Sequence, residues 1–281
     1  MNRGTLTLTC CTVAGNQAVQ GADAGGGGIE NYAGTLLINR STLSSNVTSL
    51  AGGGIENAGT LTVNECTLTG NASDNAGGGL YSGNNAATLN QSTLAGNVAG
   101  QAGGGVYGQD AVACFNSIVA GNSAPLNPDL AGALDQTGNN LIGGNPLLAP
   151  LGNYGGLTQT MPPLAGSPVI DAGAPTPFTT DQRGLQRVVG TAPDLGAVEA
   201  NVVILKVNAF TRLGLGLFQI SFSDVSATSF TVLATTNLAL PVNAWQNLGP
   251  IVETPPGSGQ FQFTDPDAVN YPRRFYLMRT P

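Results

Sequence analysis

Short segments that alternate polar and apolar residues recur throughout the first half of the chain. Residues 5–9 read TLTLT and residues 60–64 read TLTVN. A period of two is typical of β-strands that bury one face, whereas no stretch repeats apolar residues at the spacing of an amphipathic helix. Glycine and asparagine follow these segments, as expected where the chain turns sharply. The pattern therefore predicts an all-β fold.

The alternating segments belong to a repeat of about 25 residues. An asparagine follows each copy of a Ser/Cys-Thr-Leu-like triplet, and successive asparagines are 30, 25, 26 and 25 residues apart. This period fits leucine-rich repeats or a parallel β-helix, but leucine-rich repeats need a helical segment in each unit. We therefore predict a right-handed parallel β-helix with two or three short strands per coil. The repeated asparagines are Asn16, Asn46, Asn71, Asn97 and Asn122.

Equivalent residues of successive coils lie about 4.8 Å apart in such a fold, so the repeat predicts columns of side chains. The five asparagines are expected to form a hydrogen-bonded ladder at a corner. Three interior columns of aliphatic residues are expected. They are Leu6, Leu36, Leu61, Leu89 and Val112; then Val13, Leu43, Leu68, Leu94 and Val119; and finally Ile29, Ile55, Leu80 and Val106.

The repeat covers residues 1–138 and is followed by a different kind of segment, residues 139–200. Its characteristic strings are NNLIG (139–143), NPLL (145–148), PLGNYGGLT (150–158), LAGSPVIDAG (164–173), DQRG (181–184) and PDLGAVE (193–199). Over roughly residues 115–200 the chain resembles the choice-of-anchor Q domain of secreted bacterial surface proteins, although Asn145 stands where an aspartate is expected. The resemblance implies a pectin-lyase-like β-helix upstream, export and display at the cell surface. It supplies no catalytic residue.

Physically, residues 139–200 read as a C-terminal cap with extended, proline-fixed geometry. Charged side chains in it are expected to pair between loops, namely Asp171, Asp181, Arg183, Arg187, Asp194 and Glu199. Residues 201–281 predict a small β-sandwich, with strands at 202–205, 217–222, 230–233, 261–263 and 274–278. This last part is similar to terminal modules of exported proteins from planctomycete- and verrucomicrobia-like bacteria.

Composition narrows the function classes. The 281 residues include no histidine, which excludes histidine triads and imidazole metal ligands. A net charge of -7 argues against nucleic-acid binding. No run of 18 apolar residues predicts a transmembrane helix, and the N-terminus lacks a signal-peptide pattern. Because the chain starts inside the repeat, we expect the natural N-terminus to be truncated and the uncapped first coil to self-associate. The resemblance to a surface-protein module implies an extracellular or bacterial cell-surface location.

The candidate binding residues are Glu30, Glu56, Tyr81 and Tyr107, which align just after the glycine triplets. Like charges on adjacent strands repel, so the two glutamates are either solvated or bridged by a cation such as Ca²⁺. Aromatic rings stack on the apolar faces of sugars, so an acidic and aromatic stripe suits a polysaccharide or cell-surface glycan. The alternative is an ordinary exposed strand face.

An enzyme is the main alternative, because polysaccharide lyases and glycoside hydrolases share the expected fold. The coils carry few basic residues, and Arg40 aligns with Glu65 as an expected ion pair. Asp23 and Asp74 share a loop column but lie two coils apart. We therefore expect no catalysis, no cofactor, and an adhesive, glycan-contacting or structural role. The competing hypotheses are a fragment of such an enzyme, with its catalytic coils upstream, and a rigid spacer.

Overall fold

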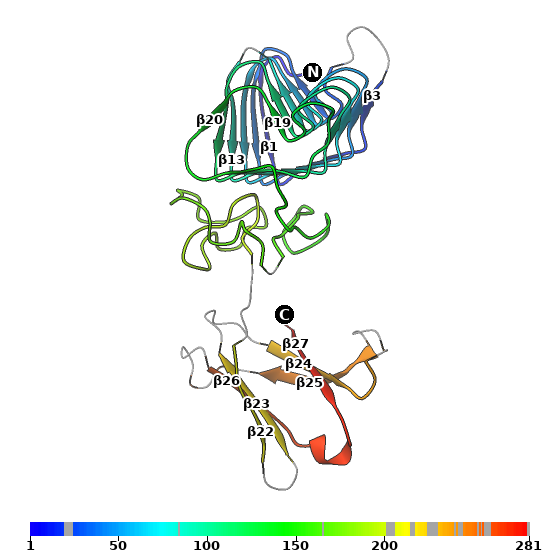
Figure 1. Cartoon of the computed structure of the whole chain (residues 1–281), viewed down its shortest axis with the longest axis vertical. Helices are drawn as coiled ribbons and strands as arrows, with labels where there is room; N and C mark the ends of the chain where they lie inside the picture. The colour runs from blue at the N-terminus through cyan, green and yellow to red at the C-terminus, as the bar shows by residue number, and fades with distance from the viewer. Residues whose placement is uncertain are drawn as a thin grey trace. The chain divides into compact units, whose positions relative to one another are not determined.

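The computed structural model describes residues 1–19, 25–83, 85–164, 166–200, 206–213, 217–223, 230–238, 240, 244–251, 253, 255 and 260–279. The chain divides into two compact units, Met1–Asn201 and Val202–Pro281, each of which is described by itself (Figure 1). Strands make up almost all of the regular structure, so the all-β prediction is confirmed. Among the described residues, no helix has the length and apolar character needed to cross a membrane.

The first unit is a β-solenoid whose strands stack in parallel into four sheets (Figure 1). Each full coil has four strands, whereas two or three were predicted. The additional strand is only two residues long, which is too short to show a period in the sequence. Sheet I contains β1 (Thr5–Thr9), β5 (Thr35–Asn39), β9 (Thr60–Asn64), β13 (Ala87–Asn90), β17 (Val112–Phe115) and β20 (Leu134–Gln136). Sheet II contains β2 (Thr12–Ala14), β6 (Thr42–Ser44), β10 (Thr67–Thr69), β14 (Thr93–Ala95), β18 (Ile118–Val119) and β21 (Leu141–Ile142).

The other two sheets complete each coil. Sheet III contains β3 (Gln17–Ala18), β7 (Val47–Thr48), β11 (Ala72–Ser73) and β15 (Val98–Ala99). Sheet IV contains β4 (Ile29–Asn31), β8 (Ile55–Asn57), β12 (Leu80–Ser82), β16 (Val106–Gly108) and β19 (Leu130–Ala131). The glycine triplets form the corner between these sheets. A Cβ atom on Gly53 would lie 2.5 Å from the carbonyl oxygens of Ala72 and Gly78, so only glycine lets the coils approach this closely.

Aliphatic columns fill the solenoid interior. The column through Val13, Leu43, Leu68, Leu94 and Val119 and the column through Ile29, Ile55, Leu80 and Val106 are confirmed by the strand register. The third predicted column is wrong at Leu89. Ala87 pairs with Leu61 and Val112, while Leu89 pairs with Val63 and Cys114. A slip of two residues keeps a side chain pointing inward, so the hydrophobic pattern alone does not fix this register.

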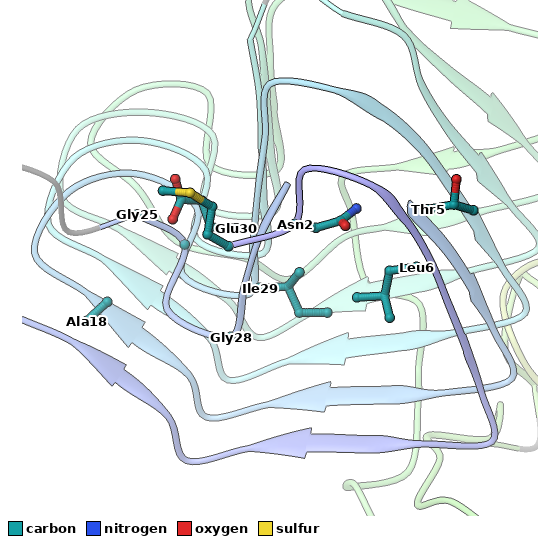
Figure 2. A pocket seen from close by; sticks show the side chains of 10 residues that line it. Asn2, Thr5, Leu6, Ala18, Gly25, Gly28, Ile29 and Glu30 are labelled. Carbon is teal, nitrogen blue, oxygen red and sulfur yellow. The ribbon is translucent and has the colours of Figure 1, made fainter. Parts of the chain in front are cut away.

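The interior is less sheltered in the first coil than in the coils that follow. Leu6 and Ile29 are half-buried, whereas their column neighbours Leu36 and Ile55 have no exposed surface. Figure 2 shows both side chains beside a hollow of about 510 Å³, which Asn2 and Glu30 also line. Self-association through this coil stays a prediction.

Residues 143–200, which we call the flank segment, have almost no regular structure and lie against the solenoid (Figure 1). They cover the outer face of sheet II, where threonine hydroxyls meet them. Gln182 Nε2 donates to Thr42 Oγ1 at 2.9 Å, and Thr67 Oγ1 donates to Gln182 Oε1 at 2.6 Å. Further along, Ile118 packs with Val169 and Leu195. The outward residues of sheet II are therefore buried from β6 to β18, whereas Thr12 and Ala14 of β2 are exposed.

A charged network lies within the flank segment, on its side against the coils. The Arg187 side chain has no exposed surface and donates to the backbone oxygens of Asp194 and Gly196 at 2.7 and 2.6 Å. A Glu199 oxygen lies 3.9 Å from Arg187 Nε, and Asp181 pairs with Arg183 at 2.7 Å. In the orientation that satisfies both of its amide atoms, Gln91 of the solenoid accepts two hydrogen bonds from Arg187. The network joins the flank segment to the coils.

The second unit contains two antiparallel sheets of three strands, with an apolar core that includes Phe222, Phe230 and Phe261. The predicted sandwich is confirmed, but the strand predicted at residues 202–205 lies outside the described residues. The strand Gln246–Ile251 was not predicted because Gly249 and Pro250 interrupt its alternation. One sheet contains β22 (Lys206–Arg212), β23 (Phe218–Ser223) and β26 (Gln260–Asp265). The other contains β25 (Gln246–Ile251), β24 (Phe230–Thr235) and β27 (Phe275–Arg279), and a 3₁₀ turn, η3 (Ala268–Asn270), precedes β27.

Candidate functional site

The four predicted binding residues lie in one outward column of sheet IV. Glu30 pairs with Glu56, Glu56 with Tyr81, and Tyr81 with Tyr107. Each is the middle residue of a three-residue strand. Because successive side chains of a strand point to opposite faces, the residues on either side of it turn inward and anchor it. In the second coil, Ile55 and Asn57 are these anchors, and both are fully buried. The structure therefore brings all four residues together, with their side chains outside the core.

The two tyrosines form a stack along the column. Their ring centroids are 5.3 Å apart and their planes differ by 4°. The Tyr81 hydroxyl accepts a hydrogen bond from Gln109 Nε2 at 2.6 Å, which holds the ring in place. Beyond Tyr107 the column continues with Ala131, which is buried. The stack therefore offers ring edges along its length.

A groove of about 490 Å³ runs beside the tyrosine stack. Tyr81 and Tyr107 line one side, and the corner between sheets III and IV lines the other with Asn75, Gln101 and Leu126. Gln101 Nε2 donates to Asn75 Oδ1 at 3.1 Å, so the two amides form a short ladder of their own. The groove combines apolar ring surface with amide donors and acceptors. Sequence reasoning missed these amides, because the equivalent corner position of the preceding coil is Leu50 and the column is therefore not uniform in residue type.

The two glutamates form an acidic pair at the first coils. Burial raises the pKa of Glu56, and the neighbouring Glu30 carboxylate raises it further. Two carboxylates are fewer than Ca²⁺ usually takes from a protein. The residues that the structure describes contain no group of three or more His, Cys, Asp or Glu side chains arranged to hold a metal ion. A cation bridge between Glu30 and Glu56 stays a prediction.

The five repeated asparagines form a continuous ladder at the corner between sheets II and III. The Nδ2 atom of each donates to the Oδ1 atom of the next, at 2.8 Å for Asn16 to Asn46 and 2.9 Å for the following three steps. Asn122 ends the ladder on the carboxylate of Asp129 at 3.0 Å. The second to fourth asparagines are fully buried. The ladder gives the buried amide groups hydrogen-bond partners within the chain. These asparagines therefore have a structural role and do not face a ligand.

The other charged candidates of the coils do not form a site. Asp23 lies outside the described residues, so nothing places it near Asp74. Arg40 and Glu65 occupy equivalent corner positions in successive coils. Among the residues that the structure describes, however, the expected ion pair between them is not formed. The flank segment explains this difference. It buries Glu65 near Arg187 and Asp181, and the burial raises the pKa of Glu65 to about 7.

Comparisons with known proteins assign the chain to no family. No family model, no curated protein and no solved structure matches the chain. The tyrosine stack, its groove and the acidic pair are therefore the features from which a function has to be argued.

Proposed function

We propose that this is an exported or cell-surface β-solenoid protein that contacts glycans through the outer face of sheet IV, without catalysis. The observation that carries the proposal is the tyrosine stack beside a groove lined by amides. Sugars combine apolar ring faces with hydroxyl groups, and such a groove offers partners for both. The resemblance of roughly residues 115–200 to a surface-protein module supports the export part of the proposal.

The geometry also indicates how a sugar chain would lie. Because each tyrosine covers one face of the other, most of the stack presents ring edges and hydroxyls to the groove. A pyranose ring would pack against these edges where Tyr81 and Tyr107 line the groove. A chain that continued from there along the groove would reach Gln101 and Asn75.

Charge narrows the class of glycan for this face. The first unit contains twelve acidic and four basic residues, and Glu30 and Glu56 extend the tyrosine column. Acidic polymers would be repelled by this field. Neutral or amino-bearing sugars are therefore the expected ligands of sheet IV.

The test is an isothermal calorimetric titration of the full chain, once with chitohexaose and once with the corresponding deacetylated glucosamine hexamer. We expect binding, with an affinity reduced at least about tenfold in the Tyr81→Ala/Tyr107→Ala double variant. Tyr32→Ala is the matched control, because Tyr32 is an exposed tyrosine that follows β4 but lies outside the column. No binding to either hexamer, or an equal loss in both variants, would overturn the proposal. A rise in reducing ends would replace contact with catalysis.

A further inference from the structure

The second unit carries a groove of a different character. It has a volume of about 220 Å³ and lies between the end of β22 and the residues that precede β27. Three arginines line it, which is a large share of the nine basic residues in the whole chain. Aromatic rings line the remainder. The residues used below are Arg212, Phe218, Tyr271, Arg273, Arg274 and Tyr276, and we call them the arginine groove.

Arg274 is the fixed wall of the arginine groove. One of its nitrogens lies 2.9 Å from an Asp265 oxygen, and Nη2 donates to Gln246 Oε1 at 2.5 Å. Its guanidinium also lies over the Tyr271 ring, 4.6 Å from the centroid. These contacts hold the charge of Arg274 and the ring of Tyr271 in one arrangement before any ligand arrives.

Arg212 and Arg273 are in a different situation. Both side chains are exposed at the groove, and neither forms an ion pair with another described residue. The carboxylate of Asp265 is already occupied, because Tyr276 donates to it at 2.8 Å and Arg274 lies beside it. Two arginines therefore line a hollow whose lining includes no described acidic residue. Guanidinium groups bind carboxylates through two parallel hydrogen bonds, so the groove is complementary to an acid group.

A second hollow adjoins the arginine groove. It measures about 180 Å³ and is lined by Thr235, Thr236 and Gln246, and it shares Tyr271 and Arg274 with the first. Tyr271 is 40% exposed, and Phe218 stacks on Tyr276 with centroids 5.3 Å apart. Two small adjoining hollows that share Tyr271 fit successive rings of a chain better than a single compact anion. The hydroxyl and amide groups of the second hollow suit sugar hydroxyls.

We propose that the arginine groove of the second unit binds an acidic polysaccharide, with a uronate carboxylate held by Arg212 and Arg273 and the neighbouring sugar ring placed against Tyr271. The charge of this unit agrees, since Val202–Pro281 contains four acidic and five basic residues. The inference does not depend on the function proposed for sheet IV. Its residues belong to the other unit, and its ligand has the opposite charge preference.

The test is a titration of the full chain with a hexamer of polygalacturonate, with dextran as the neutral comparison. We expect binding to the hexamer that weakens as salt is added, and no binding to dextran through this groove. The Arg212→Gln/Arg273→Gln variant is expected to lose at least about tenfold in affinity. Arg3→Gln is the matched control, because Arg3 is also an exposed arginine over a tyrosine, with its guanidinium 4.7 Å from the Tyr32 centroid.

The variants distinguish binding in the arginine groove from binding elsewhere on the chain. Loss of polygalacturonate binding in the double arginine variant, with binding kept in Arg3→Gln and in Tyr81→Ala/Tyr107→Ala, supports the proposal. Three results would overturn it: no binding by the unchanged chain, an equal loss in Arg3→Gln, or full binding in the double arginine variant. The thermal unfolding of each variant shows that it is folded, and both substituted arginines are exposed. Restored affinity in Arg212→Lys/Arg273→Lys, but at a lower level, would further indicate paired guanidinium contacts.

Discussion

Sheets II and IV of the solenoid are built from the same repeat, yet their outer faces differ. The outward threonines of β6, β10 and β14 in sheet II are buried beneath the flank segment, and Arg187 of that segment is buried as well. On sheet IV, the side chains of Tyr81 and Tyr107 are partly exposed and line an open groove. The threonines of the covered face are therefore enclosed with their partners, whereas the side chains of the open face keep surface toward the groove. The comparison separates groups that hold the fold together from groups that can meet a ligand.

The largest effect is expected from Arg187→Met on the covered face. The change leaves the carboxylate of Glu199 and the backbone oxygens of Asp194 and Gly196 without their buried cation. Loss of one partner of such a pair costs about 3–5 kcal/mol. Urea unfolding followed by circular dichroism would measure the loss. Trp245, the only tryptophan, lies in the second unit, so its fluorescence transition should not move. Arg3→Met is the exposed control, and an equal effect there would contradict this interpretation.

A smaller effect concerns pH, through Glu65 and Glu199. Burial raises the pKa of each carboxyl from 4.5 to about 7. The folded state therefore holds more protons than the unfolded state between these values, so stability falls as pH rises from about 4.5 to 7 and then levels. Glu65→Gln should remove part of that fall, on the order of 1 kcal/mol. Urea midpoints at pH 5 and pH 8 measure it. An unchanged pH dependence in the variant would contradict the assignment to Glu65.

The smallest effect is expected on the open face, from Glu56→Gln. Glutamine keeps the shape of the side chain and removes the repulsion from Glu30. Opposed like charges on neighbouring strands cost about 0.2–1 kcal/mol, so the variant should be slightly more stable at pH 7. Thermal unfolding with and without added Ca²⁺ measures this. If Ca²⁺ stabilised the unchanged chain and not the variant, the glutamates would be a cation site instead of a solvated pair.

The sequence predicted those parts of the fold that the repeat encodes directly. The asparagine ladder and two of the three interior columns follow from residues that recur at one spacing, and so does the outward column of Glu30, Glu56, Tyr81 and Tyr107. The register of Leu89 was not predictable, because Ala87 also points inward and a slip of two residues preserves the pattern. Local spacing fixes neighbours in adjacent coils, but it does not choose between two inward positions of one strand.

The flank segment shows a second limit of the sequence. Arg187 and Glu199 were expected to take part in charge pairs, and they do approach each other at 3.9 Å. Their burial against Gln91 of the solenoid depends on contacts between residues about a hundred positions apart, which no local pattern reports. The same holds for Glu65, whose expected partner was Arg40. The groove amides Asn75 and Gln101 were missed because the preceding coil has Leu50 at the equivalent position, so no amide column stands out from the repeat.

The most direct test of the contrast between the two faces is hydroxyl-radical footprinting of the full chain, with and without chitohexaose. Mass spectrometry would then compare the labelling of Tyr81 and Tyr107 with that of the flank segment. We predict that the hexamer protects the two tyrosines and leaves the labelling of residues 166–200 unchanged. Protection of residues 166–200 with no change at Tyr81 and Tyr107 would contradict it, because the ligand would then meet the covered face and not the open one.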